Sequence, residues 1–379
     1  MITYIEKLLN GQPVEWKTLG EVAEIKRGTS VTKKTVREGQ YPVISGGQKP
    51  AYYIDSFNRE GETITVAGSG AYAGFLMYWT EPIFVGDAFS IQIKSDSVCL
   101  RYLYHFLLSI QKQIYGLKSG GGVPHVYPKD VARISIPIPP LSVQEEIVRI
   151  LDKFTELEAE LEAELEARKQ QYEYYRNSLL SFANDLEGGG KIVYKTLGEV
   201  GTVRMCKRIL KAQTSTSGDI PFYKIGTFGK APNSYISREL FEEYRSKYSY
   251  PRKGEILISA SGTIGRAIIF DGEDAYFQDS NIVWLAHDEI EVLNKYLYYC
   301  YQVIKWKVAE GGTIQRLYND NIRDTTIPIP PLAEQTRIVN ILDKFDTLTT
   351  SLTEGLPQEI ELRRKQYEYY REQLLSFPA

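Results

Sequence analysis

The six residues Ile136-Pro137-Ile138-Pro139-Pro140-Leu141 open the stretch that decides the fold of this chain. After them, apolar side chains recur at steps of three and four residues as far as Phe182. This spacing predicts one amphipathic helix of about forty residues, because side chains at such steps share one helix face. The prolines cannot lie inside a helix, so we expect it to begin directly after them. A helix of this length needs a partner for its apolar face.

The same six residues return at 327–332, and they are one of several repeated blocks. Residues 17–22 recur as 195–200, 150–154 as 341–345, and 171–176 as 366–371, with shifts of 178, 191 and 195 residues. The segments between the blocks, 23–135 and 201–326, share few residues. A repeat this long indicates a duplicated domain rather than a solenoid. We therefore expect one scaffold that carries two different binding surfaces.

The repeats divide the chain into four parts. We expect a first globular domain at 1–140, a long helix at 141–187, a second domain at 188–331 and a second helical region at 332–379. Within the domains, short β-rich runs alternate with helical runs at 100–114 and 292–305, which predicts two α/β domains in an α+β chain. Pro357 predicts a kink or break in the second helical region. The two long helices are expected to pack on each other; packing of each helix on its own domain is the alternative.

The charge is distributed unevenly along the chain. The total of 45 Lys and Arg against 48 Asp and Glu gives a net charge of −3. Residues 10–140 and 188–331 each carry a net +3, whereas 141–187 carries −7 and 332–379 carries −2. Nucleic-acid binding depends largely on basic side chains, so two basic domains keep this class of partner open. The glutamates between 156 and 166 indicate a solvated helix face or a docking face for a basic partner.

Several classes of protein are excluded by composition. Cys99, Cys206 and Cys300 are isolated, which argues against a disulfide framework or a thiolate metal site and predicts a reducing, cytoplasmic setting. The first residues carry charges and show no apolar run typical of a secretory signal. The uncharged stretch 63–80 is interrupted by glycines, so we predict no membrane span.

The sequence contains no recognisable catalytic motif. It has no phosphate-binding loop, no nucleophile elbow and no His-Glu-x-x-His zinc motif. The three histidines are far apart, and His105 lies in an apolar helical run, as a buried core histidine would. The glycines at 68–74 are followed by an apolar strand rather than the helix of a dinucleotide site. We therefore predict no catalytic residue, no cofactor and no metal ligand.

Two divergent α/β segments, each followed by Ile-Pro-Ile-Pro-Pro-Leu and a long helix that ends in Tyr-Glu-Tyr-Tyr-Arg, resemble the specificity subunit of type I restriction-modification systems. The resemblance covers the whole chain. It implies two target-recognition domains joined by an antiparallel coiled coil with pseudo-twofold symmetry, each domain reading half of a split, asymmetric site in double-stranded DNA. It also implies that the helices dock two methyltransferase subunits, which bind S-adenosylmethionine and methylate adenine, and that restriction subunits join through the complex.

Candidate site residues follow from this resemblance together with the residue chemistry. Basic and polar side chains in loops suit phosphate contacts, and Gln or Arg can pair with base edges. The candidate DNA-binding residues of the first domain are Lys26, Arg27, Thr29, Ser30, Lys33, Lys34, Gly47, Gln48, Ser69, Tyr72, Gly121 and His125. Those of the second domain are Lys207, Arg208, Lys211, Ser261, Thr263, Arg266, Gln315 and Arg316. The candidate subunit-docking residues are Gln144, Gln335, Tyr172, Tyr175, Tyr367 and Tyr370.

Two other functions remain open at this point. The chain could be a DNA-modifying enzyme, an adenine methyltransferase or nuclease, with an unrecognised active site. It could also be a coiled-coil scaffold that makes no DNA contact. The first alternative predicts activity of the chain alone, and the second predicts that exchanging residues 23–135 leaves the methylated sequence unchanged.

Overall fold

The computed structural model describes residues 3–34, 36–182, 192–308 and 315–377. The chain forms two compact units: residues 1–163 with 358–379, and residues 164–357. The predicted domain boundary at 187/188 falls outside the described residues. None of the helices in the described part of the chain combines the length and the apolar character that a membrane span requires.

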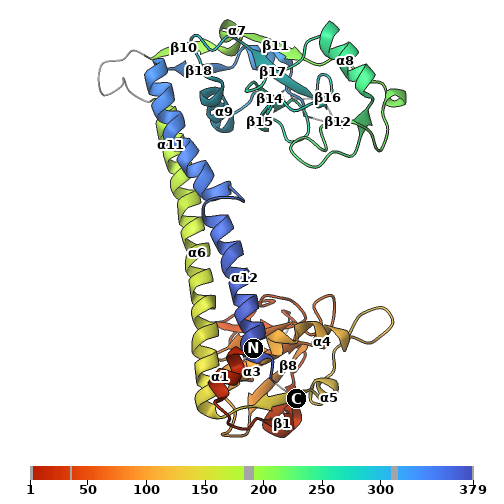
Figure 1. Cartoon of the computed structure of the whole chain (residues 1–379), viewed down its shortest axis with the longest axis vertical. Helices are drawn as coiled ribbons and strands as arrows, with labels where there is room; N and C mark the ends of the chain where they lie inside the picture. Colours follow the sequence, from red (N-terminus) through yellow and green to blue (C-terminus); the bar gives the residue numbers. More distant parts are fainter. Residues whose placement is uncertain (1–2, 35, 183–191, 309–314, 378–379) are drawn as a thin grey trace. The chain divides into compact units, whose positions relative to one another are not determined.

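The first unit combines a mixed α/β domain with parts of two long helices (Figure 1). Its domain contains α1 (Tyr4–Leu9), β1 (Glu15–Thr18), α2 (Leu19–Val22), β2 (Ala23–Arg27), β3 (Tyr41–Ile44), β4 (Tyr53–Ile54), β5 (Thr63–Ala67), β6 (Leu76–Trp79), β7 (Phe84–Val85), β8 (Ala88–Ile93), α3 (Leu100–Ser109), α4 (Gln111–Gly116), α5 (Pro128–Val131) and β9 (Ser135–Ile138). The main sheet has the order β2-β8-β5-β6 and is antiparallel. A smaller sheet has the order β4-β3-β7, and β1 pairs with β9.

The second unit repeats this topology with different sequence. Its domain contains β10 (Val193–Thr196), α7 (Leu197–Val200), β11 (Thr202–Met205), η1 (Lys211–Gln213), β12 (Ile220–Tyr223), β13 (Tyr235–Ile236), α8 (Arg238–Lys247), β14 (Ile256–Ser259), β15 (Ala267–Ile269), β16 (Tyr276–Phe277), β17 (Ile282–Ala286), α9 (Asn294–Val303), α10 (Asn319–Arg323) and β18 (Thr326–Ile329). The sheets have the orders β11-β17-β14-β15, β13-β12-β16 and β10-β18. Each matches a sheet of the first unit strand for strand, so the duplication read in the sequence is a duplication of the fold.

The apolar periodicity after Pro140 forms one helix, α6 (Leu141–Ser181), whose first part belongs to the first unit and whose second part belongs to the second. In the first unit α6 packs against α12 (Leu356–Leu375): Phe154 stacks on Tyr370 with ring centroids 5.2 Å apart. One turn further along α6, Glu158 accepts a 2.6 Å hydrogen bond from Arg364. The contacts move to higher residue numbers on α6 as they move to lower residue numbers on α12, so the two helices are antiparallel.

In the second unit α6 packs against α11 (Leu332–Thr350). Tyr175 stacks on Phe345 with ring centroids 5.5 Å apart, and Leu180 shares a buried cluster with Ile338 and Leu342. Each half of α6 therefore has its own helical partner, and both pairs join the core of the adjoining domain: Ile147 and Leu374 lie in the first core, as Leu342 lies in the second.

The second helical region is broken rather than kinked. Helix α11 ends at Thr350 and α12 begins at Leu356, so five residues separate them. Gly355 has a φ of +80°, and a Cβ at this position would lie 2.6 Å from the Thr347 carbonyl oxygen, so only glycine fits. Pro357 lies in the first turn of α12, where the missing amide hydrogen costs little. The break is thus made by the turn before Pro357.

Candidate nucleic-acid interface

Each unit places a serine after the third strand of its main sheet and bridges it to a loop near the end of the domain. In the first unit Ser69 lies opposite His125 in an antiparallel bridge. In the second unit Ser261 lies opposite Arg316 in the same way. These pairs hold equivalent places in the repeat, so the scaffold presents a histidine in one domain where it presents an arginine in the other.

The turn before the neighbouring strand of the main sheet, β8 in the first unit and β17 in the second, differs as well. Its aspartate is Asp87 in the first unit and Asp279 in the second. Asp87 accepts a hydrogen bond from the Ser69 hydroxyl. Asp279 instead accepts a 2.8 Å hydrogen bond from Arg208, while the Ser261 hydroxyl donates to Asn281 at 2.9 Å. The common backbone therefore carries two different polar networks.

In the first unit the predicted residues gather around the Ser69–His125 bridge. A Cβ on Gly46 would lie 2.5 Å from the Ser69 carbonyl oxygen, so the loop that carries Gly47 and Gln48 approaches this bridge closely. The His125 ring stacks on Tyr127 at 6.0 Å, and the Arg27 guanidinium lies 5.7 Å from the centre of the same Tyr127 ring. The predicted contacts from three separate loops thus share one region.

Exposed cations lie on a further loop of the same unit. The loop after β2 carries Thr29, Ser30, Lys33 and Lys34, and the Tyr52 hydroxyl fixes it by donating to the Val31 carbonyl at 2.9 Å. Lys33 and Lys34 are exposed and form no ion pair within the described residues. Lys26 is less free, because it pairs with Glu24 at 2.7 Å. Tyr72 and Gly121 are exposed on the neighbouring loops.

In the second unit the predicted residues border a basic cavity of about 370 Å³. Of the residues that the structure describes, the cations Arg208, Lys211, Lys224 and Arg316 line it. Gln278 and Thr214, which the sequence analysis did not select, line it as well. Asp279 also lines it and holds Arg208 in place. A cavity with this excess of positive charge suits an anionic ligand such as a nucleic-acid strand.

Some predicted contacts are engaged within the chain. Arg266 donates to the Phe228 carbonyl at 2.9 Å and Arg316 to the Ser280 carbonyl at 2.8 Å, which leaves further guanidinium donors on each. Lys207 lies 5.1 Å over the Tyr248 ring. Gln315 and Thr263 are exposed. Ser261 is only 8% exposed and its hydroxyl is bonded to Asn281, so its contact with DNA stays a prediction.

Gln144 and Gln335, for which the sequence predicts a docking role, are both completely buried. Gln144 accepts a 2.8 Å hydrogen bond from the amide of Cys99, the N-cap of α3, and donates to the carbonyls of Ser97 and Pro139 at 2.8 Å. Gln335 makes the same three bonds, with Leu293, Glu291 and Pro330, at 2.7–2.9 Å. Both glutamines satisfy backbone groups that would otherwise be buried without partners.

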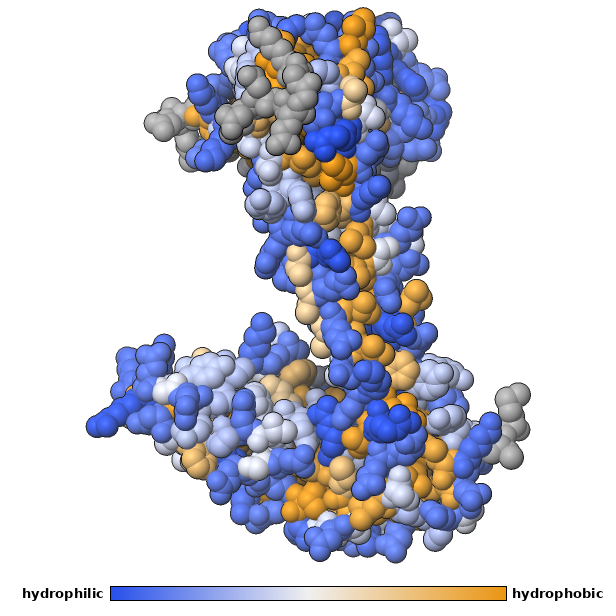
Figure 2. Space-filling view, turned by 90° about the vertical axis from the view of Figure 1, so that its left-hand side faces the viewer, coloured by the Kyte–Doolittle hydropathy of each residue, from blue (hydrophilic) through white to orange (hydrophobic). Residues whose placement is uncertain are grey.

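The repeated tyrosines divide into inward and outward sets. Tyr172 is 9% exposed and packs in the core of the second unit, and Tyr367 is half-buried beside His105, so the docking role of both stays a prediction. Tyr175 and Tyr370 keep more than a third of their surface exposed. The sequence analysis missed their neighbours Tyr174 and Tyr369, which are 68% and 60% exposed. Apolar surface also shows along the helices in Figure 2. Leu362 on α12 is 51% exposed.

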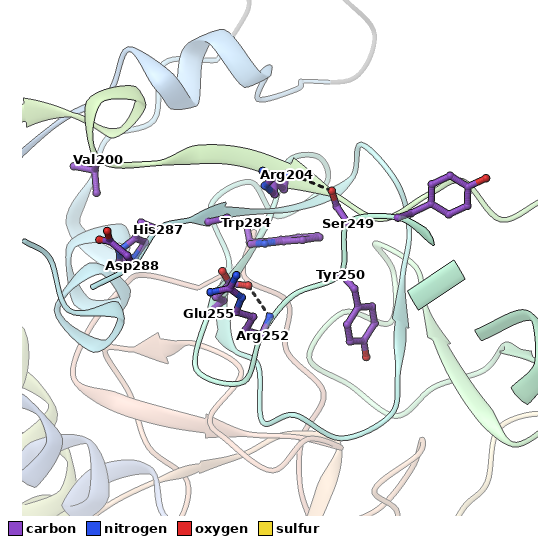
Figure 3. Close-up of a pocket in the computed structure, with 11 residues that line it drawn as sticks. Val200, Arg204, Ser249, Tyr250, Arg252, Glu255, Trp284, His287 and Asp288 are labelled. Carbon is purple, nitrogen blue, oxygen red and sulfur yellow. Dashed lines mark hydrogen bonds between the residues drawn. The ribbon is translucent and has the colours of Figure 1, made fainter. Parts of the chain in front are cut away.

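A second cavity, of about 620 Å³, lies at β11 and β17 of the second unit (Figure 3). Arg204, Arg252 and Glu255 line it, and burial raises the pKa of Glu255. The His287 ring has both nitrogens engaged, one with Asn294 at 2.9 Å and one with the Glu289 amide at 3.2 Å. These two hydrogen bonds hold the His287 ring in place. The described lining includes none of the candidate DNA-binding residues.

Two of the three thiols are buried, and the described residues show no metal-binding group. Burial raises the pKa of both Cys206 and Cys300 to about 12, so these thiols stay protonated and unreactive at neutral pH. Among the described residues, no group of three or more His, Cys, Asp or Glu side chains could hold a metal ion.

Comparisons with known proteins agree with the repeat. A family profile described as "Type I restriction modification DNA specificity domain" matches residues 13–167 and again 190–362. A Haemophilus influenzae chain named as a type I restriction enzyme specificity subunit is 52% identical over 388 residues, covering 99% of this chain and 98% of its own length. The EcoR124I/EcoR124II specificity subunit of Escherichia coli is 34% identical over 418 residues, covering 100% and 98%.

Solved structures are similar in fold. The crystal structure of a type I restriction-modification S subunit from M. genitalium aligns with a TM-score of 0.60 at 19% identity, covering 98% of each chain. A chain from a structure titled for complex assembly and conformational transition of the type I system aligns with a TM-score of 0.58 at 18% identity, covering 96% of this chain and 98% of the other.

Proposed function

Because this chain belongs to the family of type I restriction-modification DNA specificity subunits, we propose that each of its two globular domains reads one half of a split, asymmetric DNA sequence. The observation that carries this proposal is the shared backbone with different polar residues at equivalent places. His125 faces Ser69 where Arg316 faces Ser261, and Asp87 binds a serine where Asp279 binds an arginine. Two domains with the same backbone fold but different side chains at equivalent positions are suited to reading two different half-sites.

Within this proposal, side chains divide by chemistry. Gln48, Arg266, Gln315 and Arg316 read base edges, because glutamine pairs with adenine and arginine with guanine in the major groove. Lys33, Lys34, Lys207 and Lys211 contact phosphate, which positions the domain without specifying sequence. The basic cavity bordered by Arg208, Lys224 and Arg316 supports this division in the second domain, because its cations lie beside Gln278, which can also contact a base.

The repeated helices are proposed to dock two copies of one methyltransferase subunit, with restriction subunits joining through that complex. Equivalent surfaces on one chain can bind two copies of one partner. The exposed pairs Tyr174–Tyr175 and Tyr369–Tyr370 supply such equivalent surfaces, and exposed aromatic side chains are favoured at the centre of protein interfaces.

We propose further that the chain itself does not catalyse methyl transfer or cleavage. The buried, protonated thiols of Cys206 and Cys300 are in keeping with a recognition role. The purified chain with S-adenosylmethionine and DNA is expected to show no methyl transfer until methyltransferase subunits are added. Methylation by the chain alone would support the enzyme alternative instead.

The experiment that tests the proposed function is to sequence the methylated positions in the genome of a host with and without this gene. The expected result is one new methylated motif with two unlike halves separated by unspecified bases. A palindromic motif, a continuous motif or no new motif would contradict the proposal.

A further inference from the structure

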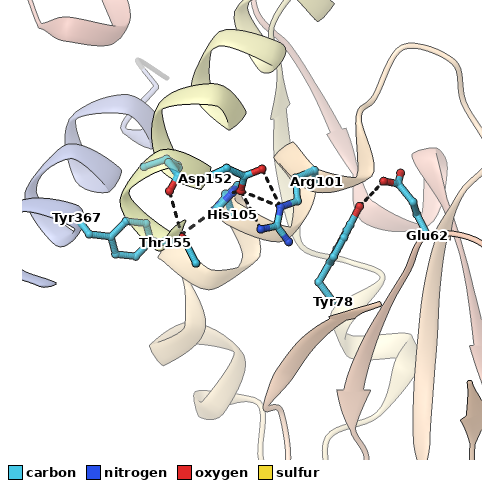
Figure 4. A network of polar contacts seen from close by, with 8 residues as sticks. Glu62, Tyr78, Arg101, His105, Asp152, Thr155 and Tyr367 are labelled. Atoms are coloured by element: carbon cyan, nitrogen blue, oxygen red, sulfur yellow. Dashed lines mark hydrogen bonds and ion pairs between the residues drawn. The ribbon is translucent and has the colours of Figure 1, made fainter. Parts of the chain in front are cut away.

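The Asp152 carboxylate on α6 contacts two side chains of the first domain's α3, Arg101 and His105 (Figure 4). Asp152 on α6 accepts hydrogen bonds from Arg101 at 2.9 and 3.2 Å and lies 2.7 Å from the Nε2 atom of His105. His105 is 1% exposed, and the Tyr367 hydroxyl of α12 lies 3.5 Å from its Nδ1 atom. The Arg101 guanidinium also lies 4.5 Å over the Tyr78 ring. This contact joins the recognition domain to both helices of its unit.

The second unit makes the same contact with other side chains. The Asp343 carboxylate on α11 accepts hydrogen bonds from Lys295 at 2.5 Å and from the Tyr299 hydroxyl at 2.6 Å. Lys295 and Tyr299 stand four residues apart on α9, as Arg101 and His105 do on α3. Their surroundings match as well, because Tyr102 donates to Pro137 at 2.8 Å and Tyr296 to Pro328 at 2.9 Å. The two contacts are therefore equivalent in place and different in chemistry.

Only the first of these contacts contains a group that titrates near neutral pH. Burial lowers the pKa of His105, against the opposing effect of Asp152, and the positive charges of Arg101 and Arg371 lower it further. Burial raises the pKa of Asp152, but the hydrogen bond from His105 and the charge of Arg101 outweigh burial and leave the pKa lowered. Burial and the hydrogen bond to Asp343 both raise the pKa of Tyr299.

These directions fix how each contact responds to pH. A histidine whose pKa is lower when its side chain is packed binds a proton more readily once the contact has opened. Acid therefore favours the open contact. For His105 this begins below about pH 6.5, the ordinary histidine value. Protonation would also place a hydrogen on Nδ1, which faces the Tyr367 hydroxyl. The raised pKa of Tyr299 weakens its contact only above about pH 10.

We infer that Asp152 and Asp343 are positioning residues, each of which holds one recognition domain on the helices of its unit. The contact with His105 makes recognition of one half-site sensitive to mild acid. The contact with Tyr299 leaves recognition of the other half-site insensitive. The inference rests on the proposed function, since it requires that each domain read one half-site. It deepens that function because the two recognition domains would respond differently to pH.

The test uses the full chain in complex with its methyltransferase subunits. Binding is measured, at about pH 7.5 and about pH 5.5, to a duplex that carries the methylated motif and to duplexes altered in one half or the other. At the higher pH both alterations should weaken binding. At the lower pH the penalty for altering one half should fall several-fold, while the penalty for the other half should persist.

Reciprocal variants identify the group responsible. His105→Tyr should make both halves insensitive to pH, and Tyr299→His should make both sensitive. His105→Gln is the second choice if the tyrosine variant does not fold, because its amide can donate to Asp152 without titrating. Equal penalties at both pH values in the unchanged chain, or a His105→Gln chain that still responds to pH, would overturn the inference.

Hydrogen exchange separates this inference from the proposed function. If neither half is read at the higher pH, the proposed function fails. The contact is then tested in the full chain alone, where α3 amides should lose protection at the lower pH relative to α9 amides, after correction for intrinsic exchange. Equal protection of α3 and α9 at both pH values would contradict the inference whether or not DNA is bound.

Discussion

Arg316 lies across an antiparallel bridge from Ser261, at the place that His125 occupies opposite Ser69 in the first unit. The bridge fixes the backbone in both domains, so the difference between them is carried by the side chain. Arg316 spends one donor on the Ser280 carbonyl at 2.8 Å and borders the basic cavity beside Arg208 and Lys224. This relationship makes Arg316 the sharpest single test of the proposed reading surface.

Arg316→Ala should weaken binding to the recognised sequence by about 1–3 kcal/mol and relax the base requirement at one position of one half-site. The reason is the loss of a guanidinium that can pair with a guanine edge. Competition binding with single-base variants of the motif measures the effect. Arg323→Ala is the matched control, because Arg323 is exposed in the same domain but pairs with Asp320. An unchanged base requirement in the Arg316 variant would remove this residue from the reading surface.

Replacing Lys33 and Lys34 together by glutamine should weaken binding to every DNA sequence by a similar factor. Both lysines are exposed and form no ion pair within the described residues, so they are available for phosphate. The slope of log affinity against log salt should become shallower by about 2, since each lost phosphate contact removes about one released counterion. Lys112→Gln, on α4 of the same unit, should leave the slope unchanged. A slope that does not change would show that this loop does not contact phosphate.

Gln144→Ala should destabilise the first unit by about 1–3 kcal/mol, because it leaves the Cys99 amide and the Ser97 and Pro139 carbonyls buried without partners. Hydrogen exchange of α3 in the full chain measures the free energy of opening, and α9 provides the internal reference. Gln335→Ala should reverse the pattern. Exposed Gln40 offers a control that should change neither. Unaltered exchange in both buried variants would contradict the structural role of these glutamines.

Tyr174→Ala should remove one of two methyltransferase subunits from the complex, and a chain that also carries Tyr369→Ala should lose both. Exposed aromatic residues at the centre of an interface often contribute 2 kcal/mol or more to binding. The mass of the assembled complex, measured by native mass spectrometry, reports the number of subunits. Tyr53→Ala replaces a similarly exposed tyrosine of the first domain and should leave the mass unchanged. A double variant that retains both subunits would place the docking surface elsewhere.

The duplicated frame could be read from the sequence because it is written in local patterns. The recurrence of residues 136–141 predicts a duplicated domain, and the three- and four-residue spacing after Pro140 predicts α6; the structure has both. The helical run predicted at 100–114 is two helices, α3 and α4, that meet at Ile110. Its apolar spacing continues across that junction, so the pattern alone did not mark the break.

The burial of Gln144 and Tyr172 was not predicted from the sequence. A glutamine repeated after a proline pair is polar and therefore suggested a surface, but three backbone groups from residues 97–139 surround it in the fold. Tyr172 lies on the apolar face of α6, and a side chain on that face packs inward. The same helical periodicity points Tyr174 outward, so this residue could have been found. The cavity that includes Gln278 could not, because its lining comes from distant segments.

The central claim is that each domain reads its own half of the DNA site, and exchanging one domain tests it most directly. Residues 23–135 would be replaced by the matching segment of another family member, and methylated genomic positions would be sequenced in a host that also supplies the methyltransferase subunits. We predict that one half of the methylated motif changes and the other half stays the same. A motif that is unchanged, or one that changes in both halves, would contradict the account.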